Sequence, residues 1–466
     1  MTATLPSPAT RAAPNPALVD ELVSLTQRWA GGQAYDDDRL VTVRTALIDA
    51  TAAHASAQIP IYRRLVTELG AGHGDRPLLD CDVFKAYDPR WIDDGDWRSM
   101  TGWLAGLHDR PPLLGRRPSD LDDWLAVLEH GGTRAVCSSG SSGMLSFVPR
   151  SAQEWELARF VGTAALAPLI ARRVGRRSER VALRAATATL GPRRVDALTQ
   201  RAPRRREAAF VLDFADGRTG NQVIGRELAR AVGVRHYLYP GTLSAVGVRA
   251  LARGPRTAAD VAALRLLQDE LVDGADAHMT RLVAAMRAGA SSARRAFVFG
   301  TPHQLLQLVT AIERSGQPVL TPRGSVVFFG GGWKNFDGGT IQRDQLIARV
   351  CSALGVRPEF VLEGYSMTEL NTMLLRCEDG RFHIPPLIEG FVVDPSLRES
   401  PTGTGRFGFR DPLATSRPGF LVTGDAVTLV DDTCPCGLTG AAITAIARAG
   451  RHEVKGCAGI AASLPV

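Results

Sequence analysis

The chain has 466 residues, of which 45% are hydrophobic, and it carries a formal net charge of +7. This length exceeds that of one small domain, and the apolar content is sufficient for a large core. No apolar run approaches the roughly 18 residues that a membrane-spanning helix needs, and residues 1–17 lack the apolar segment of a secretory signal. We therefore expect a cytoplasmic protein without a membrane partner, beginning with a disordered leader over residues 1–17.

The excess positive charge lies in one segment, from Arg172 to Arg206. This segment contains twelve arginines against Glu179 and Asp196. Such a segment can bind a polyanion or an acidic carrier protein, or it can bind nothing. No aromatic residues are interleaved for base stacking, so we do not expect a nucleic-acid partner.

The predicted elements change in character along the chain. Helical periodicity over residues 18–70 is followed by a loop-rich stretch, a short strand TRAV, a small-residue loop and a helix capped by Ser151 and Glu154. From residue 208, strands such as AAFVLDF alternate with amphipathic helices such as HQLLQLVTAIERSG, which is typical of α/β folds. Past residue 395, short strands and tight turns follow. We predict an α/β core over residues 18–395 and a β-rich part over 396–447.

The small-residue loop CSSGSSGMLS, residues 137–146, has two interpretations. Its glycines let successive backbone N–H groups converge on one point, and its hydroxyls add donors, so it suits a phosphate. The same composition also occurs in flexible linkers. Its position between a predicted strand and a capped helix favours the anion-binding loop.

A second motif, GYSMTEL at residues 364–370, follows another predicted strand. The carboxylate of Glu369 could hold Mg²⁺, and the ring of Tyr365 could stack on a base. The alternative is an ordinary helix start, with Ser366 or Thr368 as the capping residue and Glu369 in the first turn. The motif alone does not decide between them.

A third motif, LVTGDAV at residues 421–427, places Asp425 after an expected strand and a Thr-Gly turn. A carboxylate in such a turn can reach the hydroxyls of a ribose. It can equally belong to a plain hairpin turn. This motif is also undecided on its own.

Four potential metal ligands form a separate pattern, C-x5-H followed by C-P-C-G. Three thiolates and one imidazole make a full tetrahedral set, which suits a closed structural Zn²⁺ site. The alternative is a pair of turns whose cysteines bind no metal. The residues are Cys377, His383, Cys434 and Cys436.

Taken together and in this order, SSGSSG, YSMTE and TGD resemble the motifs of the adenylate-forming superfamily of acyl-CoA synthetases and adenylation domains. FGTPHQLLQL (299–308), GGGWK (330–334) and the C-terminal KGC are similar to the acyl-protein synthetase branch known from bacterial bioluminescence. IPIYRRL and CPCG are similar to phenylacetate–CoA ligase relatives, some of which carry zinc. The resemblance runs from about residue 55 to the end.

The resemblance implies an α/β fold: the large N-terminal domain of an adenylate-forming enzyme, with layered α/β sheets and a β-rich subdomain. It implies that Tyr365 stacks on adenine, that Thr368 contacts the α-phosphate, that Glu369 holds Mg²⁺ and that Asp425 binds the ribose. Arg451 matches the arginine at the hinge to a mobile C-terminal domain. The phosphates of ATP would lie against Ser138, Ser139, Gly140, Ser141, Ser142 and Gly143, and the adenine pocket would be lined by Gly330, Gly331 and Gly332.

The chain departs from the family pattern in its lysines. Many relatives have a lysine just after the phosphate loop and another in a mobile C-terminal domain of roughly a hundred residues. Here the loop continues as MLSFVPR, and after the hinge only residues 452–466 remain, so we expect that domain to be largely absent and residues 448–466 to be a hinge remnant and tail. The missing charge would come from Lys334, from arginines or from Mg²⁺.

Cys457, in KGCAG, matches the position at which acyl-protein synthetases take the acyl group as a thioester. Lys455 and Arg451 lie close to it in sequence and would favour its thiolate. The alternative is a small buried cysteine without a chemical role.

The resemblance implies an ATP-dependent ligase of a biosynthetic pathway. It would convert a small-molecule carboxylic acid to an acyl-adenylate, release pyrophosphate and pass the acyl group to a thiol or amine acceptor, including a carrier or partner protein. A coenzyme A ligase, or a relative that binds nucleotide without turnover, would share the same motifs. Neither the acid nor the acceptor can be identified from the sequence.

Overall fold

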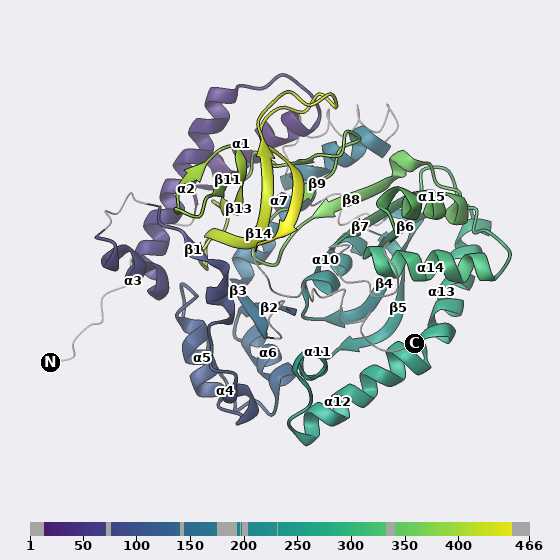
Figure 1. Ribbon diagram of the computed structural model, residues 1–466, viewed down its shortest axis with the longest axis horizontal. Helices are drawn as coiled ribbons and strands as arrows, with labels where there is room; N and C mark the ends of the chain where they lie inside the picture. Colours follow the sequence, from purple (N-terminus) through teal and green to yellow (C-terminus); the bar gives the residue numbers. More distant parts are fainter. Residues whose placement is uncertain are drawn as a thin grey trace.

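The computed structural model describes residues 14–70, 76–139, 144–174, 193–195, 197, 204–230, 232–331 and 341–449. Figure 1 shows a mostly parallel sheet packed against helices, with an antiparallel sheet and a group of N-terminal helices beside it. The parallel sheet is covered by helices on both of its faces. Among these residues, no helix is both long enough and apolar enough to cross a bilayer.

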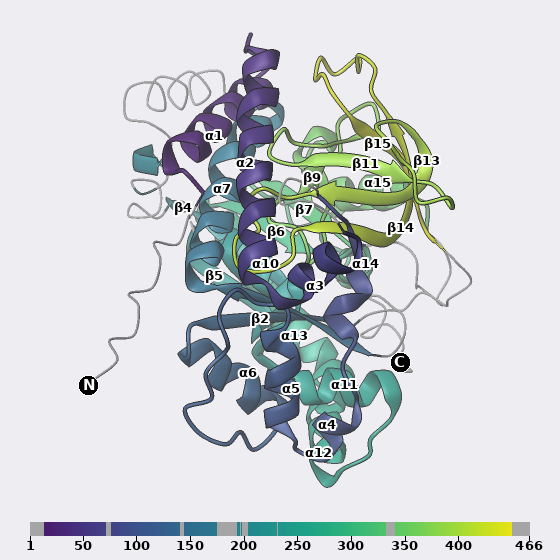
Figure 2. The same ribbon diagram turned by 90° about the vertical axis from the view of Figure 1, so that its left-hand side faces the viewer.

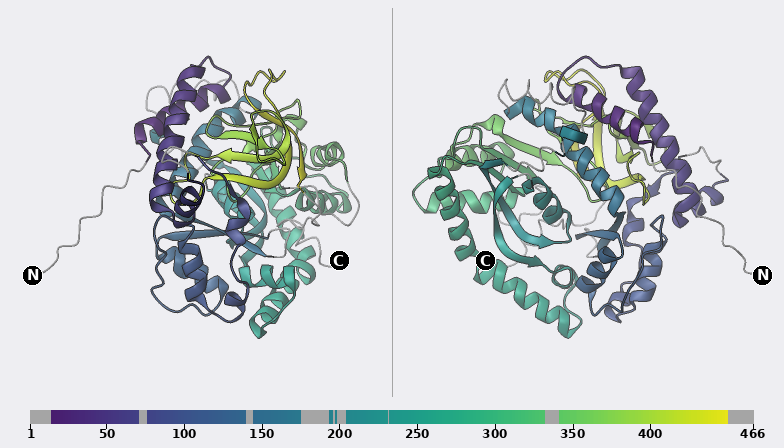
Figure 3. Two further views of the ribbon diagram at one scale, coloured as in Figure 1. Left: turned by 60° about the vertical axis from the view of Figure 1, so that its left-hand side comes forward. Right: turned by 180° about the vertical axis from the view of Figure 1, so that it is seen from behind.

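The N-terminal helices form an outer layer. Asn15 and Asp36 cap the first two by accepting hydrogen bonds from Ala17 N and Arg39 N. Figure 3 shows these purple helices beside a long blue helix. The elements are α1 (Pro16–Ala30), α2 (Asp37–Gln58), α3 (Pro60–Glu68) and the blue helix α7 (Ala152–Val174).

The small-residue loop joins two strands, β2 (Thr133–Ser139) and β3 (Leu145–Ser151), which pair as an antiparallel hairpin. The sequence had indicated a strand before the loop and a helix after it. Strand β3 was not predicted because all seven of its residues are buried, so its sequence lacks the alternation of polar and apolar residues that indicates a strand. Helix α7 follows β3 directly, and Ser151 Oγ accepts from Glu154 N at 3.1 Å, which is half of the expected capping box.

A helical group lies at one end of the molecule (Figure 2) around the buried rings of Trp97, Trp124 and Phe147. Part of it comes from the stretch that the sequence presented as loops, where aspartates cap α5 and α6. Its elements and those leading to it are β1 (Leu79–Asp80), η1 (Cys81–Lys85), α4 (Arg90–Asp93), α5 (Trp97–Ala105), α6 (Leu121–His130), α11 (Ala245–Arg253) and α12 (Ala258–Gln268).

The parallel sheet has the strand order β5-β4-β6-β7-β8-β9, and only β9 runs antiparallel to its neighbour. Adjacent parallel strands bring their carboxyl ends to one edge, where ligands of open α/β sheets bind. The strands are β4 (Arg204–Gly217), β5 (Val232–Leu243), β6 (Arg295–Gly300), β7 (Val326–Gly330), β8 (Val361–Tyr365) and β9 (Leu374–Leu375). The remaining helical elements are α10 (Gly220–Ala229), η2 (Asp269–Asp273), α13 (Ala275–Ser291), α14 (Pro302–Arg314), α15 (Arg343–Leu354) and η3 (Pro358–Phe360).

The antiparallel sheet has the order β10-β15-β14-β13-β11-β12, and β1 adds to β14 in parallel. The Thr-Gly pair that we expected to form a turn lies within β14, at an irregularity in the pairing of this strand with β13. The strands are β10 (Phe382–His383), β11 (Glu389–Val393), β12 (Glu399–Ser400), β13 (Gly403–Arg410), β14 (Phe420–Val430) and β15 (Ala442–Arg448).

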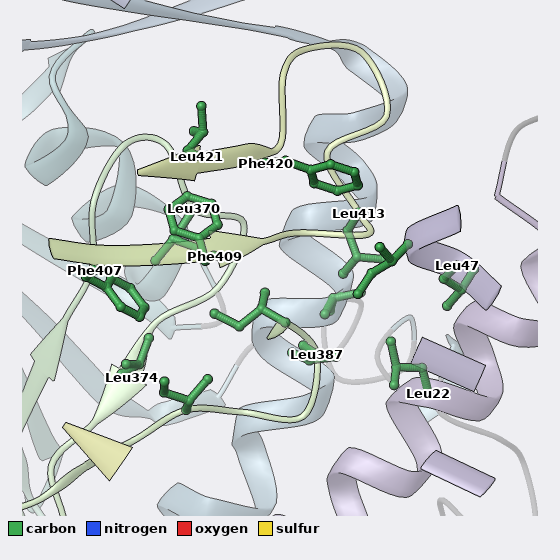
Figure 4. Close-up of a cluster of buried hydrophobic side chains, with 14 of the residues drawn as sticks. Leu22, Leu47, Leu370, Leu374, Leu387, Phe407, Phe409, Leu413, Phe420 and Leu421 are labelled. Carbon is green, nitrogen blue, oxygen red and sulfur yellow. The ribbon is translucent and has the colours of Figure 1, made fainter. Parts of the chain in front are cut away.

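One hydrophobic core joins the N-terminal helices to this sheet (Figure 4). Leu22 and Leu47 come from α1 and α2, while Phe409 and Leu421 come from β13 and β14, and all four side chains are buried. Residues from the two ends of the described chain thus form a single core, which fixes the position of the strand that carries Asp425.

Candidate active site

The sequence motifs converge near the carboxyl edge of the parallel sheet. The turn before α10 contacts the hairpin, since Cys137 N donates to Arg218 O at 2.8 Å. The same turn contacts the second motif, because a Cβ added at Gly220 would lie 2.9 Å from Thr368 Cγ2. At the loop end of the hairpin, Ser138 Oγ lies 2.5 Å from Ser146 Oγ. The ends of the small-residue loop are therefore fixed beside the Thr368 segment.

Glycines lie at or next to the carboxyl ends of the neighbouring strands β7 and β8. Gly330 pairs with Gly364, and Gly331 has a φ of +89°, a conformation that L side chains rarely adopt. A Cβ at Gly364 would lie 2.6 Å from the Phe328 ring. A side chain at Gly331 would therefore strain the backbone, and one at Gly364 would clash with a neighbouring ring.

Tyr365 connects the two sheets. Its hydroxyl donates to Asp425 Oδ2 at 2.8 Å, and Arg448 Nη1 lies 3.1 Å from Asp425 Oδ1. Burial raises the pKa of Tyr365 well above its usual value, and the charge of Asp425 raises it further. The second and third motifs are thus joined directly through a neutral phenol and a paired carboxylate.

Thr368 and Glu369 lie in a turn after β8 and not in a helix, and Thr368 Oγ1 donates to Glu369 Oε2 at 3.0 Å. Cys81, at the start of η1, adjoins both motifs. Burial raises the pKa of the Cys81 thiol to about 12, the charge of Glu369 raises it further, and a hydrogen bond from the Gly424 backbone lowers it. No signal in the sequence placed Cys81 here, because its position depends on the pairing of β1 with β14.

A buried cluster of charges lies beneath the turn. Arg417 Nε is 3.1 Å from Glu154 Oε1, and Arg150 Nε is 3.6 Å from the same oxygen. Asp411 accepts from Asn371 N at 3.1 Å. Each of these five residues is at most 7% exposed. Sequence reasoning identified only Glu154, as a cap residue, whereas its carboxylate is fully buried and accepts from Ser416 N at 2.7 Å.

The four expected metal ligands also come together. One side-chain ligand atom from each lies within 4.8 Å of the others, and all four residues are buried. Burial lowers the pKa of His383 to about 4, so the imidazole is neutral at pH 7, as a metal ligand must be. Cys377 Sγ lies 3.8 Å from Cys434 Sγ, and Cys436 Sγ lies 3.3 Å from His383 Nε2.

Several expected site residues fall outside the described residues, and their roles stay predictions. They are Gly140, Ser141, Ser142, Gly143, Gly332, Lys334, Arg451 and Cys457. Most of the arginine-rich segment also lies outside them, as does the side chain of Ser139.

The C-terminal part of the chain matches a known protein family. Residues 275–463 match the family model described as acyl-protein synthetase, LuxE, and they include the motifs around Tyr365 and Asp425. The resemblance to the acyl-protein synthetases is confirmed. The matched stretch also includes Cys457 and all four expected metal ligands, but it begins after the small-residue loop.

Two curated relatives carry the name long-chain-fatty-acid–luciferin-component ligase. The chain is 26% identical to that of Vibrio harveyi over 164 residues, which are 34% of this chain and 43% of the relative. It is 26% identical to that of Aliivibrio fischeri over 138 residues, which are 28% of this chain and 36% of the relative. These matches span less than half the length of either relative.

A solved structure supports the fold across nearly the whole chain. An open conformation of 2-hydroxyisobutyryl-CoA ligase, solved with 2-HIB-AMP and CoA, superposes with a TM-score of 0.50 at 15% identity. The superposition covers 96% of this chain and 74% of that one. The adenylate-forming ligase fold expected from the sequence is therefore confirmed.

The buried charges predict that two glutamates of α7 contribute unequally to the free energy of unfolding. Glu154→Gln removes the carboxylate that accompanies two buried guanidinium groups, so we expect the free energy of unfolding to fall by about 3–5 kcal/mol. The measurement is urea unfolding followed by circular dichroism.

Glu156→Gln, two residues further along α7, is the matched control. The Glu156 side chain is 57% exposed and pairs with Arg159, so its loss should cost less than about 1 kcal/mol. Equal unfolding midpoints for the two variants would contradict the predicted role of Glu154.

Proposed function

We propose that the protein activates a carboxylic acid with ATP. An oxygen of the acid's carboxylate attacks the α-phosphorus, the bond to the β-phosphate breaks, and the products are an acyl-adenylate and pyrophosphate. The observation that carries this proposal is the hydrogen bond from Tyr365 to Asp425, because it joins two motifs of the family at one sheet edge. The family match and the fold support the same chemistry.

The proposed roles follow the family pattern. Tyr365 provides the platform for adenine beside Gly330, Gly331 and Gly332, and Asp425 accepts the ribose hydroxyls. Thr368 contacts the α-phosphate, and Glu369 holds Mg²⁺, which offsets phosphate charge when bound. The loop at residues 138–143 surrounds the phosphates with N–H and O–H donors. Lys334 and Arg451 add positive charge near the nucleotide.

The acyl group then passes to an acceptor. A thiol or amine attacks the carbonyl carbon of the adenylate, and AMP leaves. We propose Cys457 as the first acceptor, forming a thioester that a carrier or partner protein receives in turn. This second half-reaction rests on the family match, which reaches residue 463. In this proposal, residues 18–395 and 396–447 form one large domain, and residues 448–466 form the hinge and tail.

ATP–pyrophosphate exchange with a panel of acids tests the first step. We expect exchange with at least one member of a panel of straight-chain fatty acids and short 2-hydroxy acids. Glu369→Gln should lower the exchange rate by roughly 100-fold, because it removes a charge next to the reacting phosphate.

Glu359→Gln is the control for this variant, since Glu359 precedes β8 at the opposite end of the strand and its side chain is 45% exposed. It should leave the exchange rate unchanged. Retained ATP binding without exchange for any acid would instead identify a nucleotide-binding relative without turnover.

Intact-protein mass after incubation with ATP and the active acid tests the second step. We expect a hydroxylamine-sensitive adduct of the acyl mass, absent in Cys457→Ser, while exchange continues. An adduct that persists in Cys457→Ser would exclude this cysteine. Acyl transfer to free coenzyme A without any protein adduct would favour a CoA ligase.

We also propose that the cluster of Cys377, His383, Cys434 and Cys436 holds a structural Zn²⁺. Tetrahedral zinc with Zn–S bonds of about 2.3 Å separates its sulfurs by about 3.8 Å, and Cys377 Sγ and Cys434 Sγ are 3.8 Å apart. Burial and the complete set of four ligands leave no position for substrate. The ion would join the segment after Glu369 to the segment after Asp425.

Metal analysis of the purified protein tests this site. We expect about one equivalent of zinc in the wild type and its loss in Cys434→Ser, because a structural site needs all four ligands. Cys351→Ser, on α15 and outside the cluster, should retain the metal. Zinc that stays bound in Cys434→Ser would contradict the assignment.

A further inference from the structure

Arg150 connects the hairpin below the small-residue loop to the turn that carries Thr368 and Glu369. Its Nη2 donates to Thr368 O at 2.6 Å and to Leu370 O at 3.2 Å. Its Nε donates to Asn371 Oδ1 at 2.9 Å. One guanidinium on β3 therefore donates to three acceptors in residues 368–371, a segment that lies more than two hundred positions further along the chain.

The guanidinium is itself held in place by buried partners. Arg150 is 3% exposed and shares the carboxylate of Glu154 with Arg417, while Asp411 lies 3.9 Å from Arg417. Two arginines thus face two carboxylates, and the cluster is neutral overall. Asn371 completes it by donating through Nδ2 to Glu154 Oε1 at 3.0 Å.

The turn depends on these bonds for its shape. Residues 366–371 are neither helix nor strand, so no ladder of backbone hydrogen bonds fixes them. Hydrogen bonds from a charged donor are roughly twice as strong as neutral ones, and a planar guanidinium directs several of them at fixed angles. The carbonyl oxygen of Thr368 is one of the acceptors, so the bond also orients the Thr368 side chain and the Glu369 that follows.

We propose that Arg150 is a positioning residue for the adenylation step. It couples the base of the phosphate-binding hairpin to the turn whose Thr368 and Glu369 face the α-phosphate and Mg²⁺. This inference rests on the function proposed above. It assigns to Arg150 a role in catalysis that is exerted through the turn, without contact to the nucleotide.

Three variants test the role. Arg150→Gln removes the charge and most of the donors. Arg150→Lys keeps the charge but loses the planar set of donors. Arg134→Gln is the matched control. The backbone of Arg134 lies opposite that of Arg150 in the hairpin, but the Arg134 guanidinium forms an ion pair with Glu129. Circular dichroism reports the folded fraction of each variant.

Two readouts separate positioning from stability. The first is Mn²⁺ binding in the presence of ATP, followed by electron paramagnetic resonance, which needs no acid substrate. The second is the exchange rate per folded molecule. For Arg150→Gln we expect Mn²⁺ affinity and exchange rate each to fall about tenfold or more, with smaller losses for Arg150→Lys and none for Arg134→Gln. If Arg150→Gln does not fold, Arg150→Lys carries the test.

Wild-type Mn²⁺ affinity and exchange in folded Arg150→Gln would overturn the inference. So would full activity in Arg150→Lys, because an ammonium does not replace the planar donor set. If the proposed function fails, the wild type would bind Mn²⁺ and ATP but show no ATP–pyrophosphate exchange. In that case the Mn²⁺ affinities of the variants would still test the role of Arg150. A wild type that binds no Mn²⁺ with ATP would overturn both.

Discussion

The buried cluster of two arginines and two carboxylates is the constraint on which the rest of the site depends. Charges removed from water are unstable unless they are paired and fully hydrogen-bonded, so each member requires the others to be in place. The four charged members come from β3, α7 and the loop between β13 and β14, and Asn371 adds the turn after β8, so satisfying the cluster fixes four segments at once. The geometry of the turn that carries Glu369 therefore depends on segments that are far apart in the sequence.

The parallel and antiparallel sheets contribute different parts of the site. The parallel sheet presents glycine-rich strand ends, where the backbone can approach a ligand closely. The antiparallel sheet presents Asp425 from the middle of a long strand, where it pairs with Arg448 of β15 beside an irregularity in the pairing with β13. Tyr365 lies at the junction and bonds across it.

Much of this could be predicted from the sequence, and the exceptions share a cause. Periodicity and ordered motifs indicated the α/β fold and the importance of Tyr365, Glu369 and Asp425, because those signals are local. Strand β3 was not recognised because a fully buried strand does not alternate. Arg150 and Cys81 were missed because their roles depend on contacts with residues more than two hundred positions away, which no local pattern encodes.

The shared core of the first helices and the last strands has a consequence during synthesis. Leu22 and Leu47 leave the ribosome early, yet their partners on β13 and β14 follow hundreds of residues later. At the usual 5–20 residues per second this interval lasts roughly 20–80 s. Throughout it, the apolar faces of α1 and α2 lack the part of their cover that β13 and β14 supply in the native fold, so that surface is open to chaperones that shield exposed helices.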